Sequence, residues 1–246
     1  MDIQAEALVT SMNYNWDFSV IWRYKGALLQ GLLVSLELTI FCIVVGTVLS
    51  IPIAIILSRQ TGFLKTSVNF GVEIIRALPI LVLLVWAYYV MPVLVGFSLS
   101  AFWVSAWVLA INLAAFAADI LRGSIVAIPR EHTEAAEALG MTHNLVLRRI
   151  VIPEMFRRSL PGLTAMYITM FKFSTLASVI SVWELLHSSD TVISFTYKPL
   201  EVYTAIAIIY IALIIPATYL SKALERHPLF AISPEEAEWI SPKTLA

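Results

Sequence analysis

Charged side chains within long apolar segments are the first candidates for chemistry in this sequence. Glu37 lies about ten residues into the apolar segment 27–57, and Lys172 lies about ten residues into the segment 163–182. A charge at the centre of a bilayer costs about 2.5 to 3.5 kcal/mol on insertion scales, so each group should face protein, water or a bound molecule. Two interpretations stay open: the two side chains pair with each other, or Lys172 meets a carboxylate and Glu37 an amine of a bound molecule.

A second charged group lies next to a proline. Arg76 follows Glu73 by three residues, which places both on one helix face, and it precedes Pro79 by three. Proline removes one backbone hydrogen bond and bends a helix, and the freed carbonyl can hold a polar ligand beside a cavity. Prolines also bend helices merely to fit their neighbours, so both interpretations stay open. Asp119 and Arg122, one turn apart, predict a local ion pair.

Hydroxyl side chains follow Lys172 along the same segment. Those of Ser174, Thr175 and Ser178 can bond back to their own helix or reach another helix. Lys172 and Thr175 are one turn apart, and their shared face would suit the wall of a polar pathway. Glu184 follows this segment at the membrane interface, where a charge needs no functional explanation.

The composition predicts the elements that position these residues. The chain has 246 residues, of which 59% are hydrophobic and 13% charged, and its mean hydropathy is +0.84. Soluble domains carry about 25% charged residues. A spanning helix needs about 20 apolar residues, and the backbone must be paired internally, so we expect an all-α polytopic membrane protein. The five candidate spans are about 27–57, 68–95, 102–121, 163–182 and 202–220.

Charge and cysteine content exclude several classes of site. A net charge of −1 gives no basic field for nucleic acid, and no Cys or His spacing indicates a metal site. Cys42 is the only cysteine, so a disulfide within the chain is impossible. We therefore expect neither nucleic acid nor metal as a partner.

The basic residues predict the orientation. An odd number of spans places the termini on opposite sides, and loops rich in Lys and Arg stay in the cytoplasm. With the amino terminus outside, the inner segments hold eleven of the sixteen Lys and Arg residues, and the outer segments hold three. The expected organisation is an extracytoplasmic or interfacial segment 1–26, a transmembrane domain 27–222 with a cytoplasmic loop 123–160, and a cytoplasmic tail 223–246.

A polar, basic, Ala-rich stretch, 134–153, interrupts this apolar chain. Gly140 permits the backbone conformation that ends a helix, and Pro153 predicts a later turn that a continuing helix would not tolerate. The stretch therefore predicts a helix, a turn and a second helix. Small or weakly apolar side chains would let the first helix lie flat in a groove of another protein, and they are Ala135, Ala136, Ala138 and Leu139.

The spacing of Glu134-Ala135-Ala136, Gly140, Ile150 and Pro153 resembles the EAA loop of the permease subunits of ATP-binding-cassette (ABC) importers, with Ile152 where Leu is usual. Other segments are similar to the permeases of polar amino acid importers, namely 74–81, 117–125, 172–176 and 182–186. The sequence departs from that pattern at Ala77, where Gly is common, at Asp119, where Glu is usual, and at Phe173, where an acid or Asn is common.

This resemblance implies a type I ABC importer permease fold with about five transmembrane helices, in a bacterial-type plasma (inner) membrane. It implies as partners a second, identical or similar permease, two ATPase subunits, an extracytoplasmic solute-binding protein and membrane lipid. The chain has no phosphate-binding loop of the Gly-x-x-x-x-Gly-Lys-Ser/Thr type, so it is not expected to be an enzyme; ATP and Mg²⁺ would bind the partner ATPase, and this chain itself is expected to hold no cofactor.

Two sets of functional residues follow. The expected cargo is an amino acid or a related small polar solute, and the expected pathway residues are Glu37, Arg76, Pro79, Lys172, Ser174 and Thr175. The expected ATPase-coupling residues are Glu131, Glu134, Ala135, Ala136, Ala138, Leu139, Gly140, Ile150 and Pro153.

Two other functions are compatible with some of these residues. An ion-coupled secondary carrier or channel could use Glu37, Asp119 or Lys172, but it gives no reason for the Ala-rich stretch, and no inverted repeat of spans is visible. A membrane-embedded enzyme would need a base beside a nucleophile. No histidine lies within a span, so all four are expected to be solvated loop residues, namely His132, His143, His187 and His227.

Overall fold

The computed structural model describes residues 14–59 and 61–225, and the ordered elements in these ranges are all helical. This confirms the expected all-α class. The expectations for residues 1–13 and 226–246, including His227, lie outside the described residues. The elements are α2 (Ser19–Arg23), α3 (Lys25–Leu57), α4 (Phe63–Ala77), α5 (Ile80–Tyr89), α6 (Met91–Val95), α7 (Ala101–Val126), α8 (Arg130–Ala138), α9 (His143–Val146), η1 (Leu147–Val151), α10 (Ile152–Phe173), η2 (Ser174–Ile180), α11 (Leu185–Thr196) and α12 (Pro199–Glu225).

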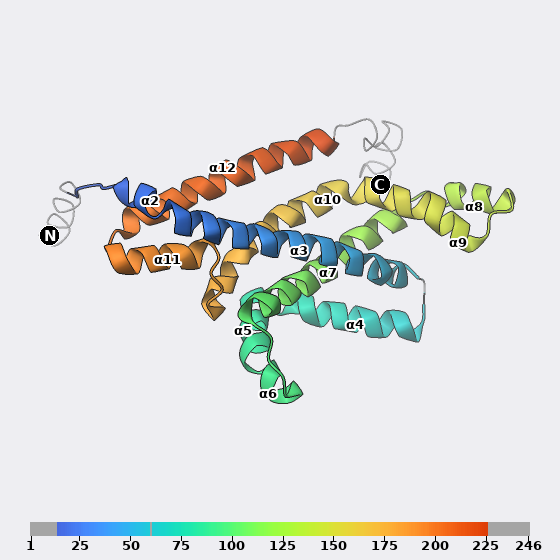
Figure 1. Cartoon of the computed structure of the whole chain (residues 1–246). Coiled ribbons are helices and arrows are strands. Elements are labelled where there is room, and N and C mark those ends of the chain that lie inside the picture. Colours follow the sequence, from blue (N-terminus) through green and yellow to red (C-terminus); the bar gives the residue numbers. More distant parts are fainter. Residues whose placement is uncertain (1–13, 60, 226–246) are drawn as a thin grey trace, which may run out of the picture.

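Long apolar helices form the body of the molecule, as the composition requires (Figure 1). Among the described residues, four helices are long and apolar enough to cross a membrane, and the bent pair of α4 and α5 brings the number to five if it counts as one span. The four long helices are Lys25–Leu57, Ala101–Val126, His143–Ile180 and Pro199–Leu224.

The second apolar segment differs from the prediction, because it is not one helix over 68–95. The chain breaks after Ala77, and α4 and α5 meet at an angle of 100°. A residue before proline is pushed out of the helical region. Leu78 is accordingly extended (φ −83°, ψ 132°), and Pro79 is extended as well (φ −57°, ψ 128°). Two successive extended residues redirect the chain, so α5 and α6 turn away from α4 (Figure 1).

The central helix is α7, of whose most apolar stretch 72% is buried. It packs most extensively against α3 and also contacts α4, α5 and α10. Small residues allow this close packing. A Cβ atom placed on Gly46 of α3 would lie 2.9 Å from the carbonyl oxygen of Ala110 and 2.9 Å from the side chain of Leu113. The glycine is therefore required where α3 crosses α7.

The turn predicted at Pro153 is wrong, because α9, η1 and α10 follow one another without a break. Pro153 lies in the first turn of α10, directly after the π-helical turn η1. Proline lacks an amide hydrogen and its ring clashes with the carbonyl four residues earlier, so it disrupts an ordinary α-helical turn. A π-turn, with bonds between residues five apart, changes that register and accommodates the proline within a continuing helix.

Candidate functional site

The Ala-rich stretch folds as a short helix with a glycine stop, α8. Gly140 adopts the left-handed conformation (φ +81°) that glycine tolerates best. Its N–H donates to the carbonyl of Glu137 (2.9 Å), and the N–H of Met141 donates to that of Ala136 (3.1 Å). These two bonds form the Schellman arrangement that ends many helices. The predicted helix and turn are thus confirmed up to the start of α9.

The two faces of α8 have different surroundings. Ala136 is 4% exposed, because its face of the helix lies against the protein's own chain, where α8 contacts α9 and η1. The expectation that Ala136 contributes to an open docking face is therefore wrong. Leu139, by contrast, is 85% exposed. The remaining exposed members of the predicted set are Glu131, Glu134, Ala135, Ala138, Gly140 and Pro153, while Ile150 is half-buried.

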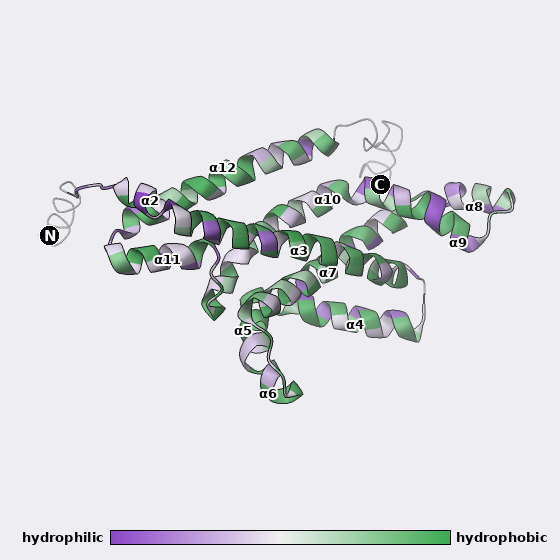
Figure 2. Cartoon of the chain, in the orientation of Figure 1, coloured by the Kyte–Doolittle hydropathy of each residue, from purple (hydrophilic) through white to green (hydrophobic). Residues whose placement is uncertain are grey.

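This exposed face lies at a polar end of the molecule. Figure 2 shows apolar ribbon along much of α3, α7, α10 and α12, and strongly hydrophilic residues near α8 and α9. A cavity of about 370 Å³ separates part of α8 from the ends of the long helices. Its lining comes from the residue that follows α3, from α7 and the loop after it, from α8 and from η1, namely Ser58, Ile125, Val126, Ile128, Arg130, Thr133 and Val151.

His132 is not merely a solvated loop residue. Its Nδ1 lies 3.3 Å from Oε2 of Glu154, which belongs to the first turn of α10. Arg158, one turn further along, donates to Oε1 of the same carboxylate from Nη2 (2.8 Å) and from Nε (3.0 Å). The spacing of Glu154 and Arg158 is readable from the sequence as a helical pair. The contact across to His132 has no such signal.

The expected pathway charges do not pair with each other. Glu37 on α3 and Lys172 on α10 are both exposed, and among the described residues neither forms an ion pair. The interpretation that they neutralise each other therefore fails for the single chain. Lys172 lies one residue before the end of α10, where the helix changes to the tighter 3₁₀ form of η2.

The hydroxyl groups after Lys172 bond back to their own helix. Ser174 Oγ donates to the carbonyl of Phe171, and Thr175 Oγ1 to that of Lys172, both at 2.8 Å. Ser178 Oγ donates to the carbonyl of Thr175 at 2.8 Å. Ser174 is completely buried. Of the two alternatives, the structure shows the local one, in which these hydroxyls satisfy backbone carbonyls at the change of helix type.

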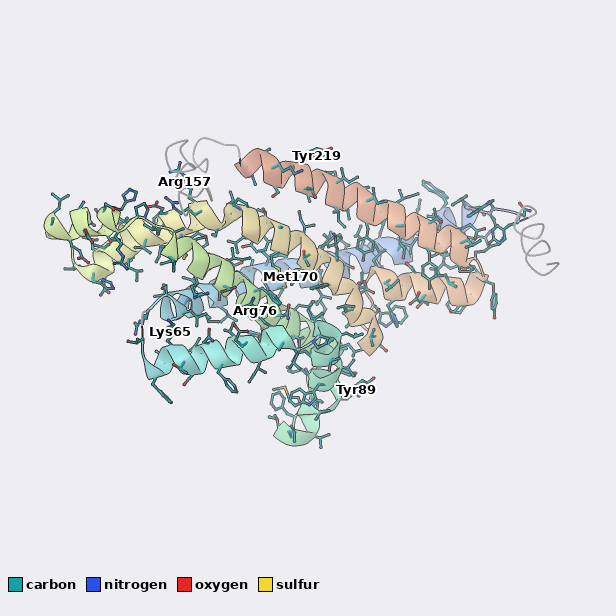
Figure 3. The ribbon with its side chains drawn as sticks, turned by 180° about the vertical axis from the view of Figure 1, so that it is seen from behind. Lys65, Arg76, Tyr89, Arg157, Met170 and Tyr219 are labelled. Atoms are coloured by element: carbon teal, nitrogen blue, oxygen red, sulfur yellow. The ribbon has the colours of Figure 1, made fainter. Side chains whose placement is uncertain are left out.

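Arg76 takes part in a larger charge cluster than the sequence predicted. Its Nη1 lies 3.5 Å from Glu73, as expected, but also 3.4 Å from Asp119 on α7. Asp119 in turn lies 3.3 Å from Arg122, which confirms the predicted local pair. Arg76 thus joins α4 to α7 just before the break at Pro79, and Figure 3 shows it between these two helices. The contact between α4 and α7 could not be read from helical spacing.

A second polar cluster, around Glu184, was also missed. Glu184 is completely buried within the protein, and it caps α11 by accepting hydrogen bonds from the N–H groups of His187 (2.8 Å) and Leu186 (3.0 Å). Ser35 of α3 donates to the same carboxylate (3.4 Å) and accepts from the N–H of Leu185 (3.1 Å). Burial raises the pKa of Glu184 to about 7, although these hydrogen bonds oppose the shift.

Close packing surrounds this cluster. A Cβ atom on Gly31 of α3 would come within 2.5 Å of Ser188 Oγ and 2.9 Å of the carbonyl oxygen of Glu184. The backbones of α3 and α11 therefore meet only because position 31 has no side chain. Glu184 and Gly31 together fix α11 against α3.

Comparisons with known proteins agree with this architecture. The octopine transport system permease protein OccM of Rhizobium meliloti is 33% identical over 234 residues, which cover 92% of this chain and 94% of the relative. The arginine transport system permease protein ArtQ of Bacillus subtilis is 28% identical over 213 residues, which cover 86% of this chain and 97% of the relative. A solved structure described as an amino acid ABC transporter with histidines superposes with a TM-score of 0.78 at 32% identity, over 87% of this chain and 99% of that one.

A family match covers most of the chain. Residues 46–228 match the family described as binding-protein-dependent transport system inner membrane component. This range contains α4 to α12 and most of the second half of α3. The chain therefore belongs to the binding-protein-dependent inner membrane components, the multi-pass permease subunits of ABC importers.

Proposed function

We propose that this chain forms, with a second permease, the pathway of an importer for an amino acid or a related small polar solute. Relatives named for octopine, arginine and glutamine transport support the cargo class. Two ATPase subunits would supply the energy and hold ATP and Mg²⁺, and a solute-binding protein would deliver the cargo on the opposite side. The proposed orientation has the amino terminus outside, which the distribution of Lys and Arg supports.

The exposed face of α8 carries this proposal. It consists of small, acidic and apolar side chains on a helix whose inner face is anchored by Ala136 and whose end is fixed by Gly140. Small side chains allow a partner to approach closely, and Leu139 supplies an apolar contact. We assign the docking of the ATPase to Glu131, Glu134, Ala135, Ala138 and Leu139.

The pathway is proposed to pass Lys172 and Glu37. Both charges are exposed in the single chain, and a charge at that depth needs a polar neighbour. Lys172 suits the carboxylate that amino acids share, and Glu37 suits their amine. Ser174 and Thr175 shape the change of helix type beside Lys172, and Arg76 with Pro79 forms the second polar region, at the break between α4 and α5.

The test is ATPase activity and transport of the purified permease, reconstituted in lipid with its ATPase and binding protein. Glu134→Lys and Ala138→Arg change the exposed face of α8 and should abolish ATPase association and solute-stimulated hydrolysis. Ala27→Arg is the matched control, because Ala27 is also an exposed alanine. It lies at the start of α3, whereas α8 lies near the end of that helix. It should leave association intact.

An alternative outcome distinguishes the competing function. Transport that continues in vesicles without ATP or any ATPase would show that the importer proposal is wrong. Glu37, Asp119 and Lys172 would then be the residues to test in an ion-coupled carrier.

A further inference from the structure

One polar contact between side chains connects the docking helix α8 to the membrane helix α10. The carboxylate of Glu154 accepts two hydrogen bonds from Arg158 and lies 3.3 Å from His132 of α8. The Arg158 side chain is only 6% exposed and that of Glu154 18%, whereas that of His132 is 45% exposed. Arg158 therefore holds the carboxylate in a largely shielded position, and His132 reaches it from the solvent side.

The rest of α8 is loosely supported. Its inner face rests on α9 and η1 near Ala136, but the cavity of about 370 Å³ lies between the start of α8 and the ends of α3 and α7. Arg130 and Thr133 of α8 line this cavity, on either side of His132. A helix beside such a space can shift when a partner moves it, since few packed atoms oppose the displacement.

The position of Glu154 determines which helix a shift of α8 would displace. It lies in the first turn of α10, after Pro153 and the π-turn η1. From there α10 continues to Lys172 and packs against α7 and α12. Displacement of α8 would therefore pull on the start of a helix that ends beside the proposed pathway.

We propose that Glu154 is a positioning residue that transmits movement of α8 to α10, with Arg158 holding the carboxylate and His132 linking it to α8. This inference rests on the proposed function. Glu154 lies in the first turn of α10 and Lys172 in its last turn, so Glu154 would act through the two helices that it joins and not on the solute directly.

A purely local role would have a different basis. A carboxylate in the first turn of a helix is stabilised by the free N–H groups there. The first turn of α10 continues from η1, so its N–H groups are not those of a free helix end. The pair with Arg158 lies within α10 and orients the carboxylate, whereas the contact with His132 is the one that crosses to α8. His132→Gln therefore separates the link from a role local to α10.

The experiment compares Glu154→Gln, His132→Gln and the double variant in the full reconstituted complex. ATPase association should be retained, while stimulation of hydrolysis by the loaded binding protein, and the solute moved per ATP, should fall about tenfold in Glu154→Gln, the size of a typical coupling between sites. The fall should be smaller in His132→Gln, because that group is the more exposed partner. The double variant should be no worse than Glu154→Gln alone, because both changes break one link.

Asp190→Asn is the matched control, since it removes the charge of an exposed carboxylate on α11, outside this link and outside the proposed pathway, and Asn can still accept the hydrogen bond from Tyr203. His132→Gln leaves the Glu154–Arg158 pair in place, so it tests the link even if Glu154→Gln does not fold. Full stimulation in Glu154→Gln, additive losses in the double variant, or lost ATPase association would overturn the proposal. A wild-type complex without ATPase-driven transport would refute the proposed function instead.

Discussion

Replacing Glu184 by Gln tests how α11 is held against α3. Burial raises the pKa of Glu184 from its ordinary value of 4.5 to about 7, which means that the folded chain favours the protonated form. This contribution to stability is fully present below pH 4.5 and is lost as the pH rises through 7. The difference corresponds to roughly 3 kcal/mol, an upper value because the side chain is held by several hydrogen bonds. Gln keeps the size of the side chain but cannot ionise.

The assay is thermal unfolding of the purified chain in detergent from pH 5 to pH 8. At roughly 2 to 4 °C per kcal/mol for a chain of this size, the native protein should lose about 6 to 12 °C more than Glu184→Gln over that range. Gln accepts one fewer hydrogen bond and lowers the midpoint at every pH, so only the slope is informative. Glu137→Gln removes an exposed carboxylate and should keep the native slope. Parallel curves for the native chain and Glu184→Gln would refute the reasoning.

Three further changes test the packing, the stop of α8 and the charge cluster. Gly46→Leu should prevent folding or lower the midpoint of thermal unfolding by at least about 5 °C, because the Cβ atom of the leucine alone would lie 2.9 Å from the Ala110 carbonyl oxygen. An unchanged midpoint would contradict this packing. Gly140→Ala should destabilise the end of α8 by about 1 to 2 kcal/mol, because alanine disfavours the positive φ of this position although its Cβ would meet no neighbour. Hydrogen exchange of the α8 amides should therefore become faster, and unaltered exchange would contradict this prediction. A double-mutant cycle of Arg76→Gln and Asp119→Asn should give a coupling below about 1 kcal/mol in denaturation, because both side chains are partly exposed, and a value above about 2 kcal/mol would show a shielded pair.

The sequence was sufficient where one local property decides the structure. The length of the apolar segments predicted the long helices. Gly140 predicted the end of α8, because few other residues adopt its positive φ. Prolines were less informative. Pro79 broke a helix that was expected only to bend, and Pro153 lies within a continuing helix because a π-turn precedes it. A proline fixes its own φ but not the angle or register of the segments around it.

The clusters at the candidate sites depend on contacts between helices. The pairs of Asp119 with Arg122 and of Glu154 with Arg158 follow from helical spacing. His132 and Glu154 are 22 residues apart, and Ser35 and Glu184 are 149 apart. No periodicity relates such positions, since they meet only after the helices have packed. For the same reason the sequence placed Ala136 on α8 but not on its buried face.

The break between α4 and α5 has a consequence for hydration. Helix α4 has 15 residues and α5 has 10, so at 1.5 Å per residue neither reaches the roughly 30 Å of a hydrocarbon core. At Leu78 and Pro79 the backbone is extended, and the last carbonyls of α4 lose the partners that a continuing helix would give. Lipid cannot solvate such groups. At the break, the backbone must therefore contact water or polar protein groups and not lipid.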